Sequence, residues 1–429
     1  MNKFSRRMLI AGTAALGIVL AGCSTPAAPG STGGDANAPA EITFLTFQSP
    51  NLTEEFWEEQ VAEIQKTYPD LKVNIQYTPD LDRQGYAKQL LATGNLPDVI
   101  WDVPINDFVA AGALLPYEES DFENISAPST AGLIDGEHYT LTLGAQVIPS
   151  IYYNMDEFER LGIEVPTTYD ELVAAAEVIK EDGKVPFLLG GAADTWASTL
   201  FLDGIITADV LGENPDWQTD RKAGTVSFTD PEFESAVTKW KDLADSGFFN
   251  SDALSIDYAT LSAKFAAGEG VMYPMGSWAG TTQADFNVGV FPLPGDDKSK
   301  TVLGLNYGQA LAVSATTKYP AQARAFAVAL ATGQGANAAQ LKSDSLIPVI
   351  TGFELPDDIS PLIKATYAVY TTEGAINVEP FGWTQGGNAL PSGFNAEFDK
   401  GAQQLLGGTI TIEEFLIALD KAYDDLVQP

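Results

Sequence analysis

Ile42–Phe47 reads ITFLTF, a nearly unbroken run of apolar and β-branched residues. A strand of this kind is typical of a parallel sheet, because helices cover both faces of such a sheet. Trp57, Val61, Ile64 and Tyr68 follow at helical spacing, so the strand leads into an amphipathic helix. This pair of elements predicts the first unit of an α/β fold.

The same alternation continues outward along the chain. We expect further strands at 73–77 and 98–101 with a helix at 83–93 between them. An extended segment at 146–153 and a helix at 169–180 then repeat the pattern. Strands that alternate with helices in this way predict right-handed crossovers and an α/β architecture.

The size of the chain indicates more than one folded unit. Its 429 residues exceed the roughly 100–200 residues of a typical single domain. Hydrophobic residues make up 45% of the sequence, which is enough to build sizeable cores. We therefore expect two lobes.

The N-terminus has the pattern of an export signal. Arg6 and Arg7 precede an apolar stretch at 8–21, which is shorter than the ~20 residues that a membrane span needs. The stretch leads into Leu-Ala-Gly-Cys, and Cys23 is the sole cysteine of the chain. This resembles the lipobox of bacterial lipoproteins, which implies removal of residues 1–22 and a lipid such as palmitate on Cys23. The alternative is an ordinary cleaved signal with an incidental cysteine, and both the Sec and the twin-arginine export routes stay open.

The segment that follows the signal is a predicted tether. Residues 24–40 are small, polar and rich in Pro and Gly, a composition that cannot build a core. With lipid on Cys23, residues 23–40 would hold a folded body at the outer face of the cytoplasmic membrane. We expect a Gram-positive bacterium, because an anchor there keeps an exported protein from diffusing away.

The charge of the chain limits its partners. The formal net charge is −35, which repels nucleic-acid phosphates and anionic lipid headgroups. Such self-repulsion also favours a soluble monomer. We therefore expect no nucleic-acid partner, and membrane contact only through the lipid.

Residues for catalysis and metal binding are scarce. His138 is the only histidine, so a Ser-His-Asp triad would depend on it, and the chain has no Gly-x-Ser-x-Gly elbow and no phosphate-binding P-loop. Zinc and copper sites favour His and Cys ligands, of which the folded part offers one. We therefore expect that the protein is not an enzyme and that it binds no metal and no cofactor. Paired carboxylates are common enough that a secreted glycosidase stays as an alternative.

Aromatic, amide and acidic side chains gather in loops beside turn-forming residues. Sugars suit this combination, because their C–H faces stack on aromatic rings and their hydroxyl groups pair with carboxylates and amides. Trp57 and Trp240 lie on helix faces and are predicted core residues, and each loop tryptophan could also be plain packing. The predicted ligand contacts of this type are Trp101, Asp102, Asp194, Trp196, Trp278, Asn306, Tyr307, Trp383 and Gln385.

Four stretches together resemble one family, the extracellular solute-binding proteins of bacterial sugar ABC importers, which include maltose-binding protein. The resemblance implies a periplasmic-binding-protein-like fold of two α/β lobes with a hinge and several crossovers. It also implies hinge closure on a sugar and recognition by a membrane permease. The four stretches are 96–102 leading to 112–116, 152–156 followed by 161–163 and 166–172, 265–268 leading to 276–279, and 405–411.

The resemblance also suggests boundaries and site residues. The first lobe is expected at 41–146 plus 284–335 and the second at 147–283 plus 336–429. Trp278 matches the Gly-x-Trp position of the family, Trp101 and Asp102 match the end of its third strand, and Trp383 matches its late aromatic loop. Weaker candidates are Asp80, Asp82, Phe47 and Gln48.

The number of candidate aromatic residues favours a di- or oligosaccharide as ligand. Two further alternatives stay open. A polyamine or another non-sugar solute would also suit acids and aromatic rings, and a sensor or adhesin could use the same fold without transport.

Overall fold

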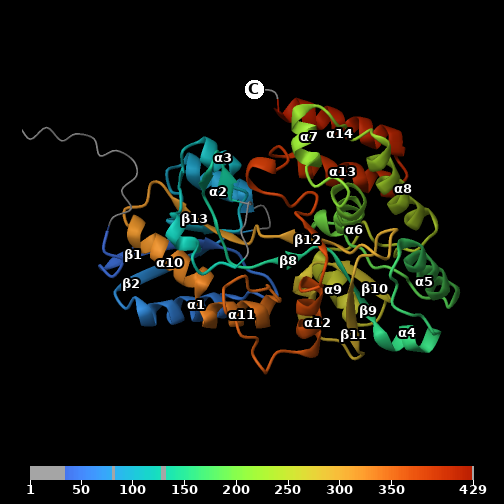
Figure 1. The fold of residues 1–429 in the computed structure, drawn as a ribbon, viewed down its shortest axis with the longest axis horizontal. Helices are drawn as coiled ribbons and strands as arrows, with labels where there is room; N and C mark the ends of the chain where they lie inside the picture. Colours follow the sequence, from blue (N-terminus) through green and yellow to red (C-terminus); the bar gives the residue numbers. More distant parts are fainter. Residues whose placement is uncertain (1–33, 80–82, 127–131, 428–429) are drawn as a thin grey trace, which may run out of the picture. The chain divides into compact units, whose positions relative to one another are not determined.

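The computed structural model describes residues 34–79, 83–126 and 132–427 (Figure 1). The predicted signal peptide, Cys23, Asp80 and Asp82 lie outside the described residues. Within the described part, no helix is both long and apolar enough to cross a membrane.

The first lobe is built on a six-stranded sheet. β1 pairs in parallel with β2 and with β3, and Phe44 lies opposite Val99 in that second pair. β13 comes from much later in the chain and runs antiparallel to β3. The strands are β1 (Ala40–Thr46), β2 (Leu71–Tyr77), β3 (Val99–Trp101), β13 (Ala310–Ser314), β4 (Leu114–Leu115) and β7 (Leu141–Thr142).

Helices cover both faces of this sheet, as the composition of Ile42–Phe47 predicts. Phe44 belongs to one apolar core and its neighbour Leu45 to another, and Val99 and Ile100 divide in the same way. The first core includes α1 (Glu54–Thr67) and α10 (Pro320–Thr332), and α11 (Gln334–Asp344) adds Ala336 to it. The second includes α2 (Arg83–Ala92) and α3 (Asn106–Ala110). The predicted α/β pattern of this region is confirmed.

The second lobe is built on a three-stranded sheet in which β9 (Ser150–Asn154) lies between β10 (Met272–Met275) and β11 (Val288–Pro292). Both pairs are antiparallel. The expected boundary at residue 284 falls between β9 and β11, although these strands pair over their whole length.

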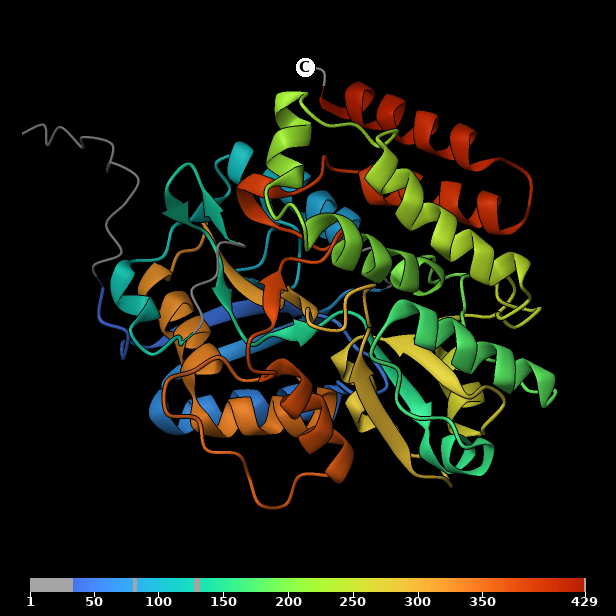
Figure 2. The same ribbon diagram turned by 45° about the vertical axis from the view of Figure 1, so that its right-hand side comes forward.

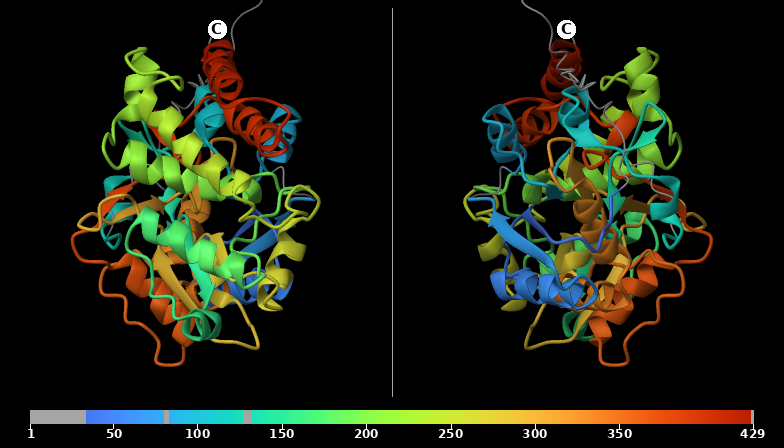
Figure 3. Two further views of the ribbon diagram at one scale, coloured as in Figure 1. Left: turned by 90° about the vertical axis from the view of Figure 1, so that its right-hand side faces the viewer. Right: turned by 90° about the vertical axis from the view of Figure 1, so that its left-hand side faces the viewer.

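Helices surround this second sheet, and the apolar faces of most of them form one large core, while α9 and α12 contribute to a second one. Threonine side chains cap the N-termini of two of them: Thr168 Oγ1 accepts from Glu171 N (3.2 Å) and Thr411 Oγ1 accepts from Glu414 N (3.1 Å). Figures 2 and 3 show the two C-terminal helices beside α8. The helices are α4 (Met155–Leu161), α5 (Tyr169–Glu181), α6 (Trp196–Ile206), α7 (Trp217–Ala223), α8 (Pro231–Asp245), α9 (Tyr258–Ala266), α12 (Pro361–Tyr370), α13 (Phe394–Leu406) and α14 (Ile412–Val427).

A third sheet lies where the chain runs between the lobes. β12 (Val302–Asn306) pairs with β8 (Gln146–Val147) and with β14 (Ile376–Val378). The backbones come so close that a Cβ on Gly304 would overlap the carbonyl oxygen of Ile148. The position therefore needs glycine.

Short elements complete the fold. They are the strands β5 (Leu133–Ile134) and β6 (Glu137–His138), the 3₁₀ turns η1 (Glu119–Phe122), η3 (Ser277–Thr281) and η4 (Gly386–Asn388), and the π-helical turn η2 (Thr207–Leu211).

Candidate ligand-binding site

Three of the predicted tryptophans meet in the second lobe. The ring centroids of Trp196 and Trp278 lie 5.8 Å apart, those of Trp196 and Trp383 lie 6.3 Å apart, and those of Trp278 and Trp383 lie 6.1 Å apart. Trp278 is 9% exposed, whereas Trp196 and Trp383 are half-buried. We call these three residues the tryptophan cluster.

Each ring of the tryptophan cluster comes from a different part of the chain. Trp196 is the first residue of α6, Trp278 lies in η3 directly after β10, and Trp383 lies in the loop after β14. The ring of Trp278 lies against Gly276, where a Cβ would overlap it. The absence of a side chain at Gly276 therefore leaves the space that the Trp278 ring occupies directly after the strand.

Two buried carboxyl groups support the tryptophan cluster. Trp383 Nε1 donates to Asp203 Oδ2 (3.4 Å), while Asp203 Oδ1 is buried and has no hydrogen-bond partner within the described part of the chain. Burial, and then the charge of Asp399, raise the pKa of Asp203 well above its usual value. Asp399 accepts hydrogen bonds from Thr195 and Thr199 (both 2.8 Å), and burial raises its pKa as well. Burial therefore disfavours the charged form of both groups.

Asp194 and Tyr258 lie beside the tryptophan cluster. Asp194 is buried and its Oδ2 accepts from Tyr258 N (2.8 Å), so it holds the start of α9. The Tyr258 ring lies 5.2 Å from that of Trp196. Burial, and with it the charge of Asp344, raises the pKa of Tyr258 to about 12. The carboxylate of Asp194 thus positions an aromatic neighbour of Trp196.

The other predicted aromatic pair has a different arrangement in the first lobe. Trp101 is 1% exposed and its ring stacks on Phe47 at 4.9 Å with an interplanar angle of 1°. The guanidinium of Arg83 lies 4.2 Å from the centroid of Phe47. Arg83 also forms an ion pair with Asp102. We call Trp101, Phe47 and Arg83 the arginine stack, in which Trp101 is a core residue and Arg83 and Asp102 are the polar groups.

The charge of Asp344 acts on Arg83 of the arginine stack and on Tyr258 beside the tryptophan cluster. It is the last residue of α11, and its Oδ1 accepts from Asn51 Nδ2 (2.9 Å). Burial raises the pKa of Asp344 to about 7, against the hydrogen bond from Asn51 and the charge of Arg83, which lower it. Burial lowers the pKa of Arg83 to about 10, and the charge of Asp344 opposes this change.

The remaining predicted contacts lie near the third sheet or at the surface. Asn306 is buried and donates to Gln146 Oε1 (3.0 Å), and its Oδ1 accepts from Gly308 N (2.8 Å). Gln385 donates to Gly308 O (3.4 Å). Tyr307 is half-buried, and burial raises its pKa. Gln48 is exposed. The side chain of Asn306 is therefore occupied by protein partners, whereas Gln385 Oε1 is buried with no hydrogen-bond partner among the described residues.

The lobes also contact each other away from the tryptophan cluster. Asn106 Nδ2 in α3 donates to Gly386 O (2.8 Å). Lys88 in α2 donates to Ser392 Oγ (3.1 Å) and pairs with Asp107 (2.6 Å). The chain segment that follows Trp383 is thus hydrogen-bonded to the first lobe at Gly386 and Ser392.

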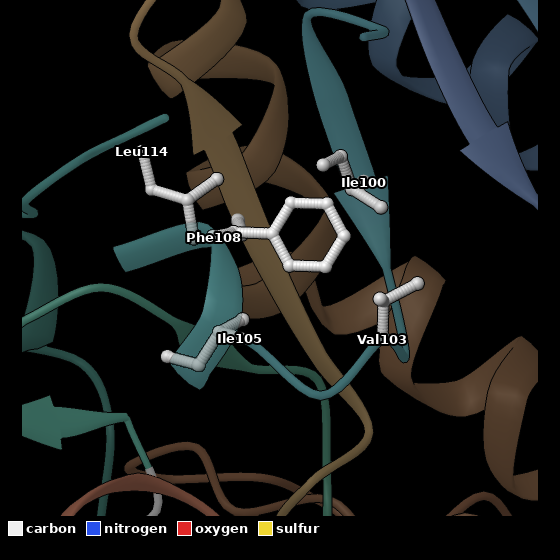
Figure 4. Close-up of a pocket in the computed structure, with 6 residues that line it drawn as sticks. Ile100, Val103, Ile105, Phe108 and Leu114 are labelled. Atoms are coloured by element: carbon white, nitrogen blue, oxygen red, sulfur yellow. The ribbon is translucent and has the colours of Figure 1, made fainter. Parts of the chain in front are cut away.

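One apolar pocket lies elsewhere, in the first lobe (Figure 4). Ile100, Phe108 and Leu114 are among the side chains that line it, and all six are hydrocarbon. It offers no group that could hydrogen-bond a sugar hydroxyl, so it belongs to the core.

Arg83, Tyr258, Asp203 and Asp344 were not predicted from the sequence. All four lie on helices, where a charged residue usually marks a solvated face. The signal that could have indicated Tyr258 is its place directly after Asp257, whose side chain caps α9. Within the described residues, no group of three or more His, Cys, Asp or Glu side chains could hold a metal ion.

Comparisons with known proteins place this geometry in a family. The model of the bacterial extracellular solute-binding proteins matches residues 49–336. The multiple sugar-binding protein of Streptococcus mutans is 27% identical over 282 residues, which are 61% of this chain and 65% of that protein. The alignment thus spans less than two thirds of this relative.

Solved structures show the same fold. A chitin oligosaccharide binding protein has a TM-score of 0.78 at 22% identity, and the match covers 90% of this chain and 99% of that one. The raffinose complex of RafE has a TM-score of 0.75 at 22% identity, and the match covers 91% of this chain and 100% of that one. The fold is therefore the predicted periplasmic-binding-protein-like one.

The family comprises exported proteins that bind solutes and are not enzymes, in agreement with the scarcity of catalytic residues. The match covers more than half of the chain, and it confirms the resemblance seen in the four stretches. The chain belongs to the bacterial extracellular solute-binding proteins.

Proposed function

We propose that this protein binds a di- or oligosaccharide between the tryptophan cluster and the arginine stack and delivers it to an ABC permease. The observation that carries the proposal is the tryptophan cluster, in which three separate segments bring indole rings within 6.3 Å of one another. Two of these rings are half-buried, so they keep surface for a ligand. Aromatic walls with a few placed polar groups are typical of small-molecule sites.

The polar groups favour a neutral ligand. Asp194 and Asp203 both accept hydrogen bonds from protein N–H groups, and the raised pKa of Asp203 weakens its attraction for a cation. Arg83 is balanced by Asp102. A polyamine would need free carboxylates, and an anion would need a free guanidinium. A sugar needs neither.

Binding would act through lobe closure. A ligand that contacts both lobes stabilises the closed arrangement relative to the open one. The strand pairing of β11 with β9, and the packing of α11 on α10, support revised boundaries. In this proposal the first lobe spans about 40–145 and 310–344, the second spans about 150–292 and 361–427, and the segments between them form the crossings.

The ligand class has support from the relatives. The Streptococcus mutans protein is named for several sugars, and the structural neighbours for chitin oligosaccharide and raffinose. All of these are consistent with a site that has several aromatic rings. We extend the proposal to a monomer held by lipid on Cys23 at the outer face of the cytoplasmic membrane of a Gram-positive bacterium.

A thermal-shift screen tests the ligand class. Mono-, di- and oligosaccharides and spermidine are added separately to the purified protein. A ligand at a hundredfold excess over its dissociation constant raises stability by about 2.7 kcal/mol. We expect the largest shift with a di- or oligosaccharide. A shift with spermidine and with no sugar would overturn the proposal.

Calorimetry on Trp278→Ala then tests the site. We expect affinity for the best sugar to fall by roughly one to two orders of magnitude, which is about 1.4–2.7 kcal/mol. The circular dichroism spectrum should stay unchanged. An unaltered affinity would remove Trp278 from the site.

A further inference from the structure

The position of Asp344 has a consequence for ligand recognition. The residue is 8% exposed, lies at the end of α11 and precedes Ser345, whose φ is +49°. From Ser345 the chain leaves α11 toward α12, so Asp344 stands where the chain passes from the first lobe to the second. It is therefore a buried acid at a crossing, where an unpaired charge is costly.

Asp344 faces charged or titratable groups from both lobes. Its charge acts on Arg83 of the arginine stack, which lies in α2. It also acts on Tyr258, whose ring contacts Trp196 of the tryptophan cluster. The hydrogen-bond partner of Asp344, Asn51, follows Phe47 of the arginine stack by four residues, and α11 packs against η3, which carries Trp278 of the tryptophan cluster. Asp344 thus ends a helix that adjoins both regions that we propose to enclose the sugar.

The protein satisfies this carboxyl group only in part. Its Oδ1 accepts from Asn51, and among the described residues no hydrogen bond ends on its Oδ2. Arg83 is already paired with Asp102. A carboxylate has about four acceptor sites, so capacity is left for another donor.

We infer that Asp344 is a ligand contact that accepts a hydrogen bond from a sugar hydroxyl between the two lobes. This inference rests on the proposed function and names a specificity residue within it. The hydroxyl that reaches Asp344 must lie between the arginine stack and the tryptophan cluster. A sugar that lacks it leaves the carboxylate buried with one donor fewer, which is the arrangement that gives the strongest discrimination.

The protonation state of Asp344 would modulate this contact. Burial raises its pKa to about 7, so the acceptor form is lost as the pH falls from 8 to 6. Other elements pack against α11 as well. η3 carries no titratable side chain, α10 carries Arg324, which pairs with Asp121 (2.7 Å), and α1 carries Glu54 and Glu58, which act on Tyr77.

Calorimetry on the full chain tests the inference, with the sugar that gives the largest thermal shift. Asp344→Asn should weaken binding at pH 8 by at least tenfold, because the sugar hydroxyl loses a charged acceptor and a hydrogen bond to a charged group is stronger than one to a neutral group. Asp358→Asn is the matched control. Asp358 is exposed, and it pairs with Lys342 (2.7 Å), which lies on α11, the helix that ends at Asp344. The control variant should bind as the wild type does.

A pH series separates a contact from a structural role. Wild-type affinity should fall between pH 8 and pH 6, while that of Asp344→Asn should change less. An Asp344→Asn protein that melts as the wild type does and binds the sugar equally well would overturn the inference.

If the ligand is not a sugar, the proposed function and the Asp344 contact can still be judged separately. If only spermidine stabilises the wild type, the sugar function fails. Loss of the spermidine response in Asp344→Asn would then still support Asp344 as a contact, and an unchanged response would refute it.

Discussion

The tryptophan cluster and the arginine stack use the same type of residue in opposite ways. Trp383 follows β14 in a loop and stays half-buried, with its Nε1 bound to Asp203. Trp101 is the last residue of β3, and its ring is enclosed by Phe47 and Trp57. Successive strand residues point to opposite faces, so the last strand position still belongs to a core. A ring at the last position of a strand is thus a core ring here, whereas a ring in the loop after β14 keeps part of its surface free.

The charges differ between the two regions as well. Arg83 covers the open face of Phe47 and pairs with Asp102, so its charge is balanced. Beside the tryptophan cluster, burial raises the pKa values of Asp203 and Asp399, and the charge of Asp399 raises that of Asp203 further. We therefore expect the first region to respond to mutation through stability and the second through affinity and pH.

The largest effect should come from Trp101→Ala. Removing a fully buried tryptophan leaves a cavity, and we expect the free energy of unfolding to fall by about 3–5 kcal/mol. Urea denaturation measures this change. Trp101→Phe, which keeps an aromatic ring against Phe47, should lose less. A loss below about 1 kcal/mol for Trp101→Ala would show that the ring is not a core residue.

Trp383→Ala should act on affinity instead. We expect sugar binding to weaken by roughly tenfold to a hundredfold, because an exposed stacking surface is lost. Stability should change less than in Trp101→Ala. Trp240→Phe is the control, since Trp240 is fully buried in the second lobe and should leave the affinity unchanged. Equal affinity of Trp383→Ala and the wild type would make the tryptophan cluster a packing feature.

Asp203→Asn should change the pH dependence of stability. The pKa of Asp203 is higher in the folded than in the unfolded protein, so the folded state holds the proton longer. Stability contributed by this group is therefore lost as the pH rises from about 4 toward the folded pKa. The mutant should gain on the wild type by up to about 1.4 kcal/mol for each pH unit in this window.

Urea titrations between pH 4 and 8 measure this gain. Asp216→Asn at an exposed position serves as control and should run parallel to the wild type. A constant difference between Asp203→Asn and the wild type at every pH would contradict the raised pKa.

Arg83→Lys should have the smallest effect. Lysine keeps the charge opposite Asp102 but lacks the planar group that lies over Phe47. Since the side chain of Arg83 is 30% exposed, we expect a loss of only about 0.5–1 kcal/mol in the free energy of unfolding. A loss as large as that of Trp101→Ala would mean that the guanidinium organises the whole stack.

Local pattern predicted the first lobe well. The run Ile42–Phe47 and the spacing of Trp57, Val61 and Ile64 depend on near neighbours, and each has its element in the structure. The antiparallel second sheet was missed, because β9 pairs with β10 and β11, which both lie more than a hundred residues later in the chain.

The candidate site could be predicted only in parts. The residues of the tryptophan cluster were identified one by one from small residues around them, but their meeting depends on the packing of α6, η3 and the loop after β14. Arg83 and Asp344 were missed because their partners are far away in the sequence. Asn51, for example, lies 293 positions from Asp344.

The bonds from Asn106 to Gly386 and from Lys88 to Ser392 join the two lobes without any ligand. Their free energy is the same whichever sugar is bound, so it cancels when two sugars are compared. These bonds would raise the affinity for every solute by the same factor. Preference for one sugar over another must therefore arise from surfaces that the sugar itself touches, and strengthening the bonds would make a stronger binder that is no more selective.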